Sequence, residues 1–309
     1  MADYGAQGAD ADGGRKGKSQ KDILTDARER LRNCISAYGV ERDKQLDDLR
    51  FATLDQWPSD VRNARENDPN GARPCLTFDQ ASQYLNQVVN DMRQKRPSIK
   101  PRPVDSGADV ETAEIFQGVI RQIEDQSQAG VAYDTAAESA VRIGEGYFRI
   151  ITEYEDALSF NQVIKICRIP NPFNVYLGPH VMPDGSDAEY GFILERIPLE
   201  QFKRDFKGKK YEAADFADVR QSDFSWGDQK EILVAEYFYT EFEAMEVLFL
   251  EDGTTISESD YRKIEGDKAE IAVDAMGKER RRRSQKKKIK WCKLTGIEIL
   301  EERDWAGKY

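Results

Sequence analysis

Apolar residues recur every three or four positions in a stretch that begins shortly after Pro74, a spacing that places them on one face of a helix. Thr77 stands before the stretch and Gln80 follows three residues later, a spacing at which the two side chains can cap the first helical turn. We therefore predict a helix over residues 77–96. Its apolar stripe consists of Phe78, Ala81, Leu85, Val88 and Met92.

Three prolines end this helix and favour an extended crossing, because proline lacks a backbone N–H and restricts the residue before it. They are Pro97, Pro101 and Pro103. Two more helices are predicted over residues 109–126 and 133–143, and Gly144 ends the second of them. A strand follows over residues 147–151. The first of these two helices is expected to turn Ala113, Phe116, Ile120 and Ile123 inward.

The region before Pro74 is also expected to be helical. Apolar positions from Lys21 onward again follow steps of three and four, Gly39 is expected to interrupt the helix, and a second piece ends at Trp57-Pro58. Residues 62–72 are polar and rich in turn formers, so they connect this region to the next. The apolar positions of the first piece are Leu24, Ala27, Leu31, Cys34 and Tyr38.

The second half of the chain is rich in β-branched and aromatic runs, which are typical of strands. Strands are predicted over residues 163–169, 173–177, 189–196, 232–239 and 245–250, and a short helix over residues 199–206. Asp252-Gly253 is a hairpin turn. A basic arm over residues 280–288 then runs into a β-hairpin that turns at Thr295-Gly296.

These elements predict an α+β fold, with helices packed on a mixed or antiparallel sheet and a basic β-hairpin near the C-terminus. Residues 1–19 lack apolar content and are expected to be a disordered tail. Residues 20–270 are expected to form one α+β domain, and residues 271–309 a basic arm and hairpin. The chain is expected to be the front part of a longer polypeptide.

Charge is distributed unevenly along the chain. The net charge is −11, yet ten basic residues and one acid lie between Lys278 and Lys293, a net +9 that leaves −20 for the rest. Residues 231–260 contain nine acids and no basic residue. This acidic hairpin is a solvated sheet face, a surface that repels DNA, or a partner for a basic neighbour, and the first interpretation is favoured.

Candidate catalytic chemistry is sparse. The single histidine, His180, lies in a loop without a nucleophile or metal partner at a recognisable spacing. Residues 13–19 resemble a phosphate-binding loop, but its first glycine would have to replace Asp12 and no strand precedes it. Asp184 and Asp187 do not complete a calcium-loop pattern. We therefore expect no enzymatic activity, no cofactor and no metal.

The four cysteines are far apart, and none forms a Cys-x-x-Cys pair. This spacing favours reduced, mostly packed thiols rather than disulfides or a zinc site. No run of eighteen apolar residues predicts a membrane span, and the N-terminus lacks the apolar core of a signal peptide. The cytosol is therefore the expected compartment. The cysteines are Cys34, Cys75, Cys167 and Cys292.

The order of these features over residues 60–305 resembles the front half of portal proteins, the head-to-tail connectors of short-tailed double-stranded-DNA bacteriophages. The matching segments are Arg73-Pro74, residues 85–89, 96–100, 113–114, 134–147, 174–176, 187–190 and 236–238. Gly178-Pro179 departs from the family, which usually has an acid before that proline. The stem helix, tunnel loop and crown of the family have no counterpart before Tyr309.

The resemblance implies a ring, typically of twelve subunits, at one vertex of the capsid in the virion. It implies assembly in the host cytoplasm, a channel through which terminase pumps double-stranded DNA, and contacts with a head–tail adaptor, capsid and scaffolding proteins. Residues 20–270 would be the wing domain, and residues 271–309 would lie in the wing sheet or start the clip. The expected DNA or partner contacts are Arg280, Arg281, Arg282, Arg283, Lys286, Lys287 and Lys288.

Two alternatives belong to other functional classes. The first is a nucleic-acid-binding module that uses the basic residues between Lys278 and Lys293, with Trp291 and Trp305 as stacking platforms for bases. The second is an enzyme of the packaging machinery, which would require a phosphate loop or clustered carboxylates that the sequence does not contain.

Overall fold

A computed structural model describes residues 19–69, 71–96, 98–103, 109–210, 231–264, 270–274 and 277–305. The predicted disordered tail and the phosphate-loop lookalike fall almost entirely outside these residues. The described chain divides into two compact units, Met1–Cys34 with Tyr176–Tyr309, and Ile35–Val175. Helix α1 (Gln20–Ala52) contributes its first half to one unit and its second half to the other.

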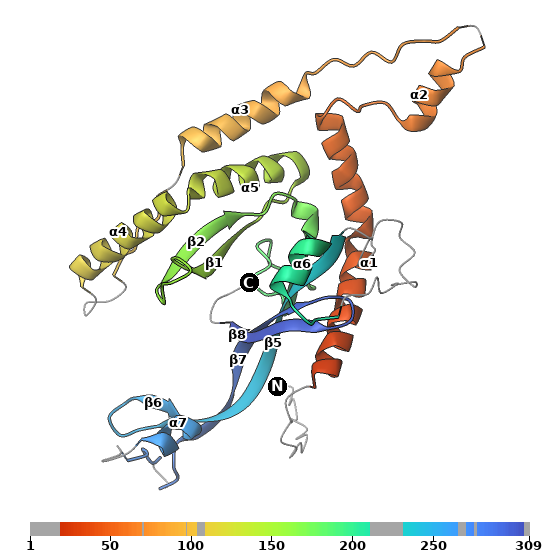
Figure 1. Cartoon of the computed structure of the whole chain (residues 1–309). Coiled ribbons are helices and arrows are strands. Elements are labelled where there is room, and N and C mark those ends of the chain that lie inside the picture. Colours follow the sequence, from red (N-terminus) through yellow and green to blue (C-terminus); the bar gives the residue numbers. More distant parts are fainter. Residues whose placement is uncertain are drawn as a thin grey trace, which may run out of the picture. The chain divides into compact units, whose positions relative to one another are not determined.

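The unit of residues 35–175 is built on a β-hairpin. Strands β1 (Phe148–Tyr154) and β2 (Gln162–Arg168) pair antiparallel, and helices α4 (Val110–Gln126) and α5 (Ala129–Ile143) pack along them (Figure 1). Its small core contains Ala129, Ala132 and Ile166, with Ile123 and Tyr133 packed against it. The predicted helices and strands therefore exist here with boundaries shifted by a few residues.

Two glycines shape the turn from α5 into β1. Gly144 caps α5 with a positive φ of 84°, a conformation that glycine adopts without a Cβ penalty. Gly146 lies so close to α5 that a Cβ at this position would overlap the carbonyl oxygen of Ala136. The sequence Gly144-Glu145-Gly146 thus fixes both the end of the helix and the close approach of the strand.

Helix α3 (Ala81–Gln94) differs from its prediction in two ways. It begins at Ala81 rather than Thr77, and its N-cap Gln80 makes no side-chain capping hydrogen bond. Its one buried residue is Val89, whereas Phe78, Val88 and Met92 of the predicted stripe are 73%, 48% and 47% exposed. The expectation that this stripe packs within the chain is therefore wrong.

Arginines at the C-terminal end of α3 and just after it form ion pairs with α5. Arg96 lies 2.6 Å and Arg93 3.5 Å from the carboxylate of Asp134 on α5. Phe116 of α4 is also exposed, at 58%, contrary to its expected inward position. This unit consequently presents more apolar helix surface to solvent than the hydrophobic pattern predicted.

The N-terminal helical region is continuous. Helix α1 passes through Gly39 without interruption, and a Cβ at Gly39 would meet no atom within 4 Å. An interior glycine costs roughly 1 kcal/mol relative to alanine, which is less than the packing and ion pairs of a long helix supply. Helix α2 (Ser59–Glu66) overlaps the first part of the segment 62–72 that was predicted as a connection. Gly71 closes the predicted turn, and its N–H donates to the Asp68 carbonyl (3.0 Å).

The other unit contains a six-stranded sheet with the order β3-β4-β5-β7-β8, and β6 pairs with the far end of β5. The register pairs β4 with β5, β5 with β7 and β7 with β8, each antiparallel. Its elements are β3 (Val175–Leu177), β4 (Tyr190–Pro198), α6 (Leu199–Asp205), β5 (Glu231–Phe249), β6 (Thr255–Ser257), α7 (Glu258–Lys263), β7 (Arg281–Leu294) and β8 (Ile299–Trp305). The 3-10 helix η1 (Pro172–Asn174) precedes β3 and belongs to the unit of residues 35–175.

The core of this sheet is aliphatic and aromatic. Ile197, Phe202, Ile232, Val234 and Leu300 form one buried cluster, which joins α6 to strands β4, β5 and β8. The ring of Tyr237 stacks between those of Phe192 and Tyr239, with centroid distances of 4.6 and 4.9 Å. The α+β class predicted from the sequence is therefore confirmed.

Candidate interaction surface

The basic residues singled out by the sequence lie on strand β7 or immediately before it, and they face an acidic strand. Two predicted strands, residues 232–239 and 245–250, are one strand of 19 residues, β5. The segment between them was not recognised as a strand because it is polar. Its glutamates stand opposite lysines and an arginine of β7: Glu241 opposite Lys288, Glu243 opposite Lys286 and Glu246 opposite Arg283.

The two strands extend beyond their neighbours. Strand β4 accompanies β5 from Glu231 to Tyr239, and β8 accompanies β7 from Ile289 to Leu294. Residues 241–246 of β5 and 283–288 of β7 therefore form a two-stranded ribbon, which we call the arm, and it leads to β6 and α7 (Figure 1). An isolated two-stranded ribbon is only marginally stable in water, so the arm depends on stabilisation by side-chain pairs between its strands.

Ion pairs connect β5 and β7 within the arm and at the end of the arm next to the main sheet. Lys288 lies 2.9 Å from Glu243, and Lys290 lies 3.2 Å from Glu241. The hydrogen bond from Lys288 lowers the pKa of Glu243 and raises the pKa of Lys288. These directions keep both groups charged across the neutral range. The acidic strand thus pairs with a basic neighbour, which is one of the three interpretations of its sequence.

The remaining predicted contacts differ in their surroundings. Arg281 forms ion pairs with Glu279, Glu246 and Glu258. Arg280 stacks its guanidinium 4.4 Å from the ring centroid of Phe249. The side chain of Arg283 is 95% exposed and lies 4.0 Å from Glu246. Arg282, Lys286 and Lys287 are exposed as well.

One of the two stacking platforms expected of a nucleic-acid-binding module, Trp291, is not available to a base. Trp291 is only 5% exposed, its indole N–H donates to the Glu236 carboxylate (3.0 Å), and the Arg303 guanidinium lies 4.3 Å from its ring centroid. Trp305 packs edge-on against Phe238 with centroids 5.3 Å apart. The expectation is therefore wrong for Trp291, which belongs to the sheet packing, whereas Trp305 is half-buried and its role as a platform stays a prediction.

The loop that carries His180 is held together by its own side chains. The Nδ1 atom of His180 lies 2.8 Å from the Gly178 carbonyl oxygen. Asp187 accepts backbone hydrogen bonds from Val181 (2.7 Å) and Met182 (3.1 Å), and the bond from Val181 is the main cause of its lowered pKa. These contacts give both residues a structural role in the loop. Within the described residues, no group of three or more His, Cys, Asp or Glu side chains could hold a metal ion.

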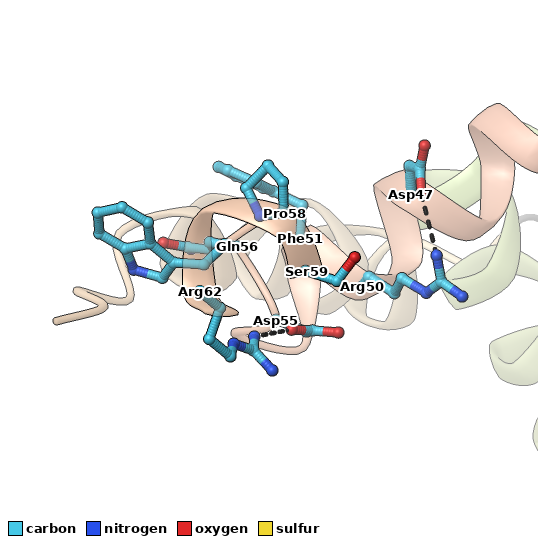
Figure 2. A pocket seen from close by; sticks show the side chains of 9 residues that line it. Asp47, Arg50, Phe51, Asp55, Gln56, Pro58, Ser59 and Arg62 are labelled. Atoms are coloured by element: carbon cyan, nitrogen blue, oxygen red, sulfur yellow. Dashed lines mark hydrogen bonds and ion pairs between the residues drawn. The ribbon is translucent and has the colours of Figure 1, made fainter. Parts of the chain in front are cut away.

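A hollow lies at the corner between α1 and α2, and Figure 2 shows the side chains that line it. Arg62 forms an ion pair with Asp55, and Arg50 lies 3.3 Å from Asp47. The charged groups of the hollow thus neutralise one another, and its geometry points to no ligand class. The lining residues are Asp47, Arg50, Phe51, Asp55, Gln56, Trp57, Pro58, Ser59 and Arg62.

Two arginines of α1 with structural roles, Arg30 and Arg42, were not predicted from the sequence. In the sheet unit, Arg30 donates to the Tyr237 hydroxyl (2.8 Å). In the other unit, Arg42 is 8% exposed and donates to the carbonyls of Val175 (2.6 Å) and Pro172 (3.3 Å). A charged residue within an amphipathic pattern carries no signal of burial, so only the structure reveals these anchors.

The cysteines are free thiols, as expected from their spacing. Cys34 and Cys292 are buried, and burial raises their pKa values to about 11 and about 12. Cys75 and Cys167 are partly exposed. Among the described residues, no helix combines the length and the apolar character needed to cross a membrane.

Taken with the exposed apolar helix faces, the charged arm is a feature of a structural protein that works through contacts with other macromolecules. Residues 28–309 match the family described as phage P22-like portal protein, and the chain belongs to this family. Portal proteins are structural, non-enzymatic components of phages, in agreement with the prediction. The resemblance stated from the sequence is thereby confirmed.

One relative shows how much of such a protein the chain represents. The chain is 26% identical over 244 residues to a portal protein of Acyrthosiphon pisum secondary endosymbiont phage 1. The match covers 76% of this chain and 33% of the relative. The chain therefore spans about one third of the length of the relative that it matches.

Proposed function

We propose that the chain is the wing-like N-terminal part of a portal subunit, and that twelve identical subunits form a ring at one vertex of the capsid. Membership of the P22-like portal family over residues 28–309 carries this proposal. Rings need heterologous contacts, in which different surfaces of neighbouring copies meet. The exposed apolar helix faces and the arm supply surface for such contacts.

The ring would be the channel for genome packaging and ejection. Double-stranded DNA must slide through such a channel, so a wall that grips phosphates would oppose its function. The charge pattern supports this role, because the basic residues are concentrated on β7 and face the glutamates of β5. An acidic remainder of the chain, with a net charge of −20 outside the segment from Lys278 to Lys293, would not retain the DNA backbone.

The proposal includes the location and the partners of the protein. The ring would reside at the portal vertex of the virion after assembly in the host cytoplasm, among capsid and scaffolding proteins. Terminase would dock on it during packaging, and a head–tail adaptor would replace terminase afterwards. The seven basic residues at 280–283 and 286–288 are proposed as contacts for these partners or for DNA, and the Arg283 side chain is 95% exposed.

The domain boundaries are part of the same proposal. Residues 20–270 would be the wing, and strands β7 and β8 share the sheet of β4 and β5. This sharing supports an assignment of residues 271–309 to the wing sheet rather than to the start of a clip.

The proposal can be tested in infected cells by labelling the protein with a small epitope tag and locating it on isolated capsids. We expect the label at a single vertex, and a phage that lacks the gene is expected to accumulate capsids without DNA. Label spread over all vertices, or DNA-filled capsids without the protein, would contradict the proposed function.

A further inference from the structure

The two strands of the arm have opposite charges, and their outer edges lie on opposite sides of the ribbon. Residues 241–246 of β5 contain Glu241, Glu243 and Glu246 and no basic residue. Residues 283–288 of β7 contain four basic residues and no acid. In the part of the chain that the structure describes, β4 pairs with β5 only as far as Tyr239, and β8 pairs with β7 only as far as Ile289, so neither strand pairs with these segments.

From this arrangement we infer that the arm is a contact between copies of the chain, in which the β5 edge of one copy lies against the β7 edge of the next. The inference rests on the proposed ring. Within the chain, the acidic segment already pairs with the basic segment at the register Glu241 to Lys288, Glu243 to Lys286 and Glu246 to Arg283. The outer edge of the acidic segment in one copy and the outer edge of the basic segment in the next copy are complementary in charge in the same way.

Charge decides which edges can meet. Two β5 edges would bring glutamates together, and two β7 edges would bring lysines and arginines together, so both two-fold arrangements are repulsive. A β5 edge against a β7 edge is attractive and uses two different surfaces. That is the heterologous contact from which closed rings are built. Charged edge strands generally prevent unwanted pairing. Here the charges disfavour contacts between two β5 edges or two β7 edges, and they favour the contact between a β5 edge and a β7 edge.

Excess charge on β7 also favours a partner outside the chain. The four basic residues at 283–288 exceed the three glutamates opposite them, and the Arg283 side chain is 95% exposed. An acidic neighbouring edge would neutralise this excess. A second copy provides such an edge at the same height of the ring, because each subunit carries the same arm in the same orientation.

A charge-swapped chain tests the inference. Glu241→Lys, Glu243→Lys and Glu246→Lys are combined with Arg283→Glu, Lys286→Glu and Lys288→Glu. The three directly opposite pairs stay complementary, whereas the ion pairs of Glu241 with Lys290 and of Glu246 with Arg281 are lost. Copies of the swapped full-length protein are expected to form rings with one another. In a ring that mixes wild-type and swapped copies, acid meets acid at one junction and base meets base at another.

The readout is co-assembly of differently tagged wild-type and swapped proteins. We expect mixed rings below about one tenth of the statistical proportion, because each mismatched junction is repulsive. A matched control swaps the exposed pair Glu153 and Lys165 on the β1–β2 hairpin, 2.7 Å apart, and should mix statistically. Statistical mixing of the arm variant would overturn the inference. Absence of rings from wild-type protein would instead overturn the proposed function.

A measurement on the wild-type protein covers the case in which the swapped chain does not fold. Hydrogen exchange of the amides at 241–246 and 283–288 is compared between assembled and dissociated protein. We expect at least about tenfold slower exchange at these amides on assembly, since covered edges are protected. Unchanged exchange at both edges in assembled rings would overturn the inference.

Discussion

Arg42 provides the sharpest test of how the unit of residues 35–175 is held together. Its guanidinium is buried between the rings of Tyr38 and Phe173, at 5.2 and 5.1 Å from their centroids. It donates to the carbonyls of Pro172 and Val175 and lies 3.7 Å from the Glu145 carboxylate. Arg42→Met keeps most of the packing volume but removes the hydrogen bonds to the two carbonyls and to the Gln45 side chain, and it leaves a partly buried carboxylate without this counter-charge.

Each hydrogen bond from a charged donor contributes about 1.5–3 kcal/mol, so Arg42→Met should destabilise the local structure by about 3 kcal/mol. Arg42→Lys should lose roughly half of that amount, because an ammonium group lacks the planar fork that reaches two carbonyls. A loss of about 3 kcal/mol corresponds to more than about 100-fold faster opening.

Hydrogen–deuterium exchange of the segment around η1 measures this opening directly, and urea unfolding gives the accompanying loss of stability. Arg50→Met is the matched control, since Arg50 lies on the same helix with a side chain 61% exposed and only an i,i+3 pair with Asp47. It should change stability by less than about 0.5 kcal/mol. Exchange in Arg42→Met within twofold of the wild type would refute the assigned role of Arg42.

Further predictions concern single sites. In urea titrations, Gly146→Ala should clearly lower the unfolding midpoint, because its Cβ would overlap the Ala136 carbonyl. Gly39→Ala should raise the free energy of unfolding by about 0.5–1 kcal/mol. A stabilised Gly146→Ala together with a destabilised Gly39→Ala would refute both assignments. Stability should fall as pH rises from about 9 through about 11, since the folded state holds the proton of Cys34 more tightly than the unfolded chain, and Cys34→Ala should reduce that fall. Glutamine at Arg282 and Arg283 should weaken an already low DNA affinity and reduce its salt slope by about 2, and a steep slope that persists would favour the nucleic-acid-binding alternative.

Local signals in the sequence located most elements of the fold. The positive-φ glycine at 144 and the Asp252-Gly253 turn stand where the sequence predicts a break, because a glycine's conformational freedom is a property of the residue itself. Helix α4 and strand β4 were located to within two residues for similar reasons.

Features that depend on distant partners could not be predicted in the same way. Strand β5 continues through a polar segment because its glutamates pair with basic residues of β7 that are distant in the sequence, such as Glu243 with Lys286. Part of the stripe on α3 is exposed, at Val88 and Met92, because the helix buries Val89 instead, and a hydrophobic pattern alone does not show which face meets a partner. At the candidate surface, the basic residues could be found from their density in the sequence. Their pairing with glutamates of β5 could not be predicted, because it depends on the register of β5 and β7.

Particle mass and symmetry of the purified full-length protein test the central claim most directly. Native mass spectrometry combined with negative-stain electron microscopy is expected to show one species of about twelve subunits, seen as rings with a central hole. A protein that remains strictly monomeric at micromolar concentration and physiological salt would contradict the account.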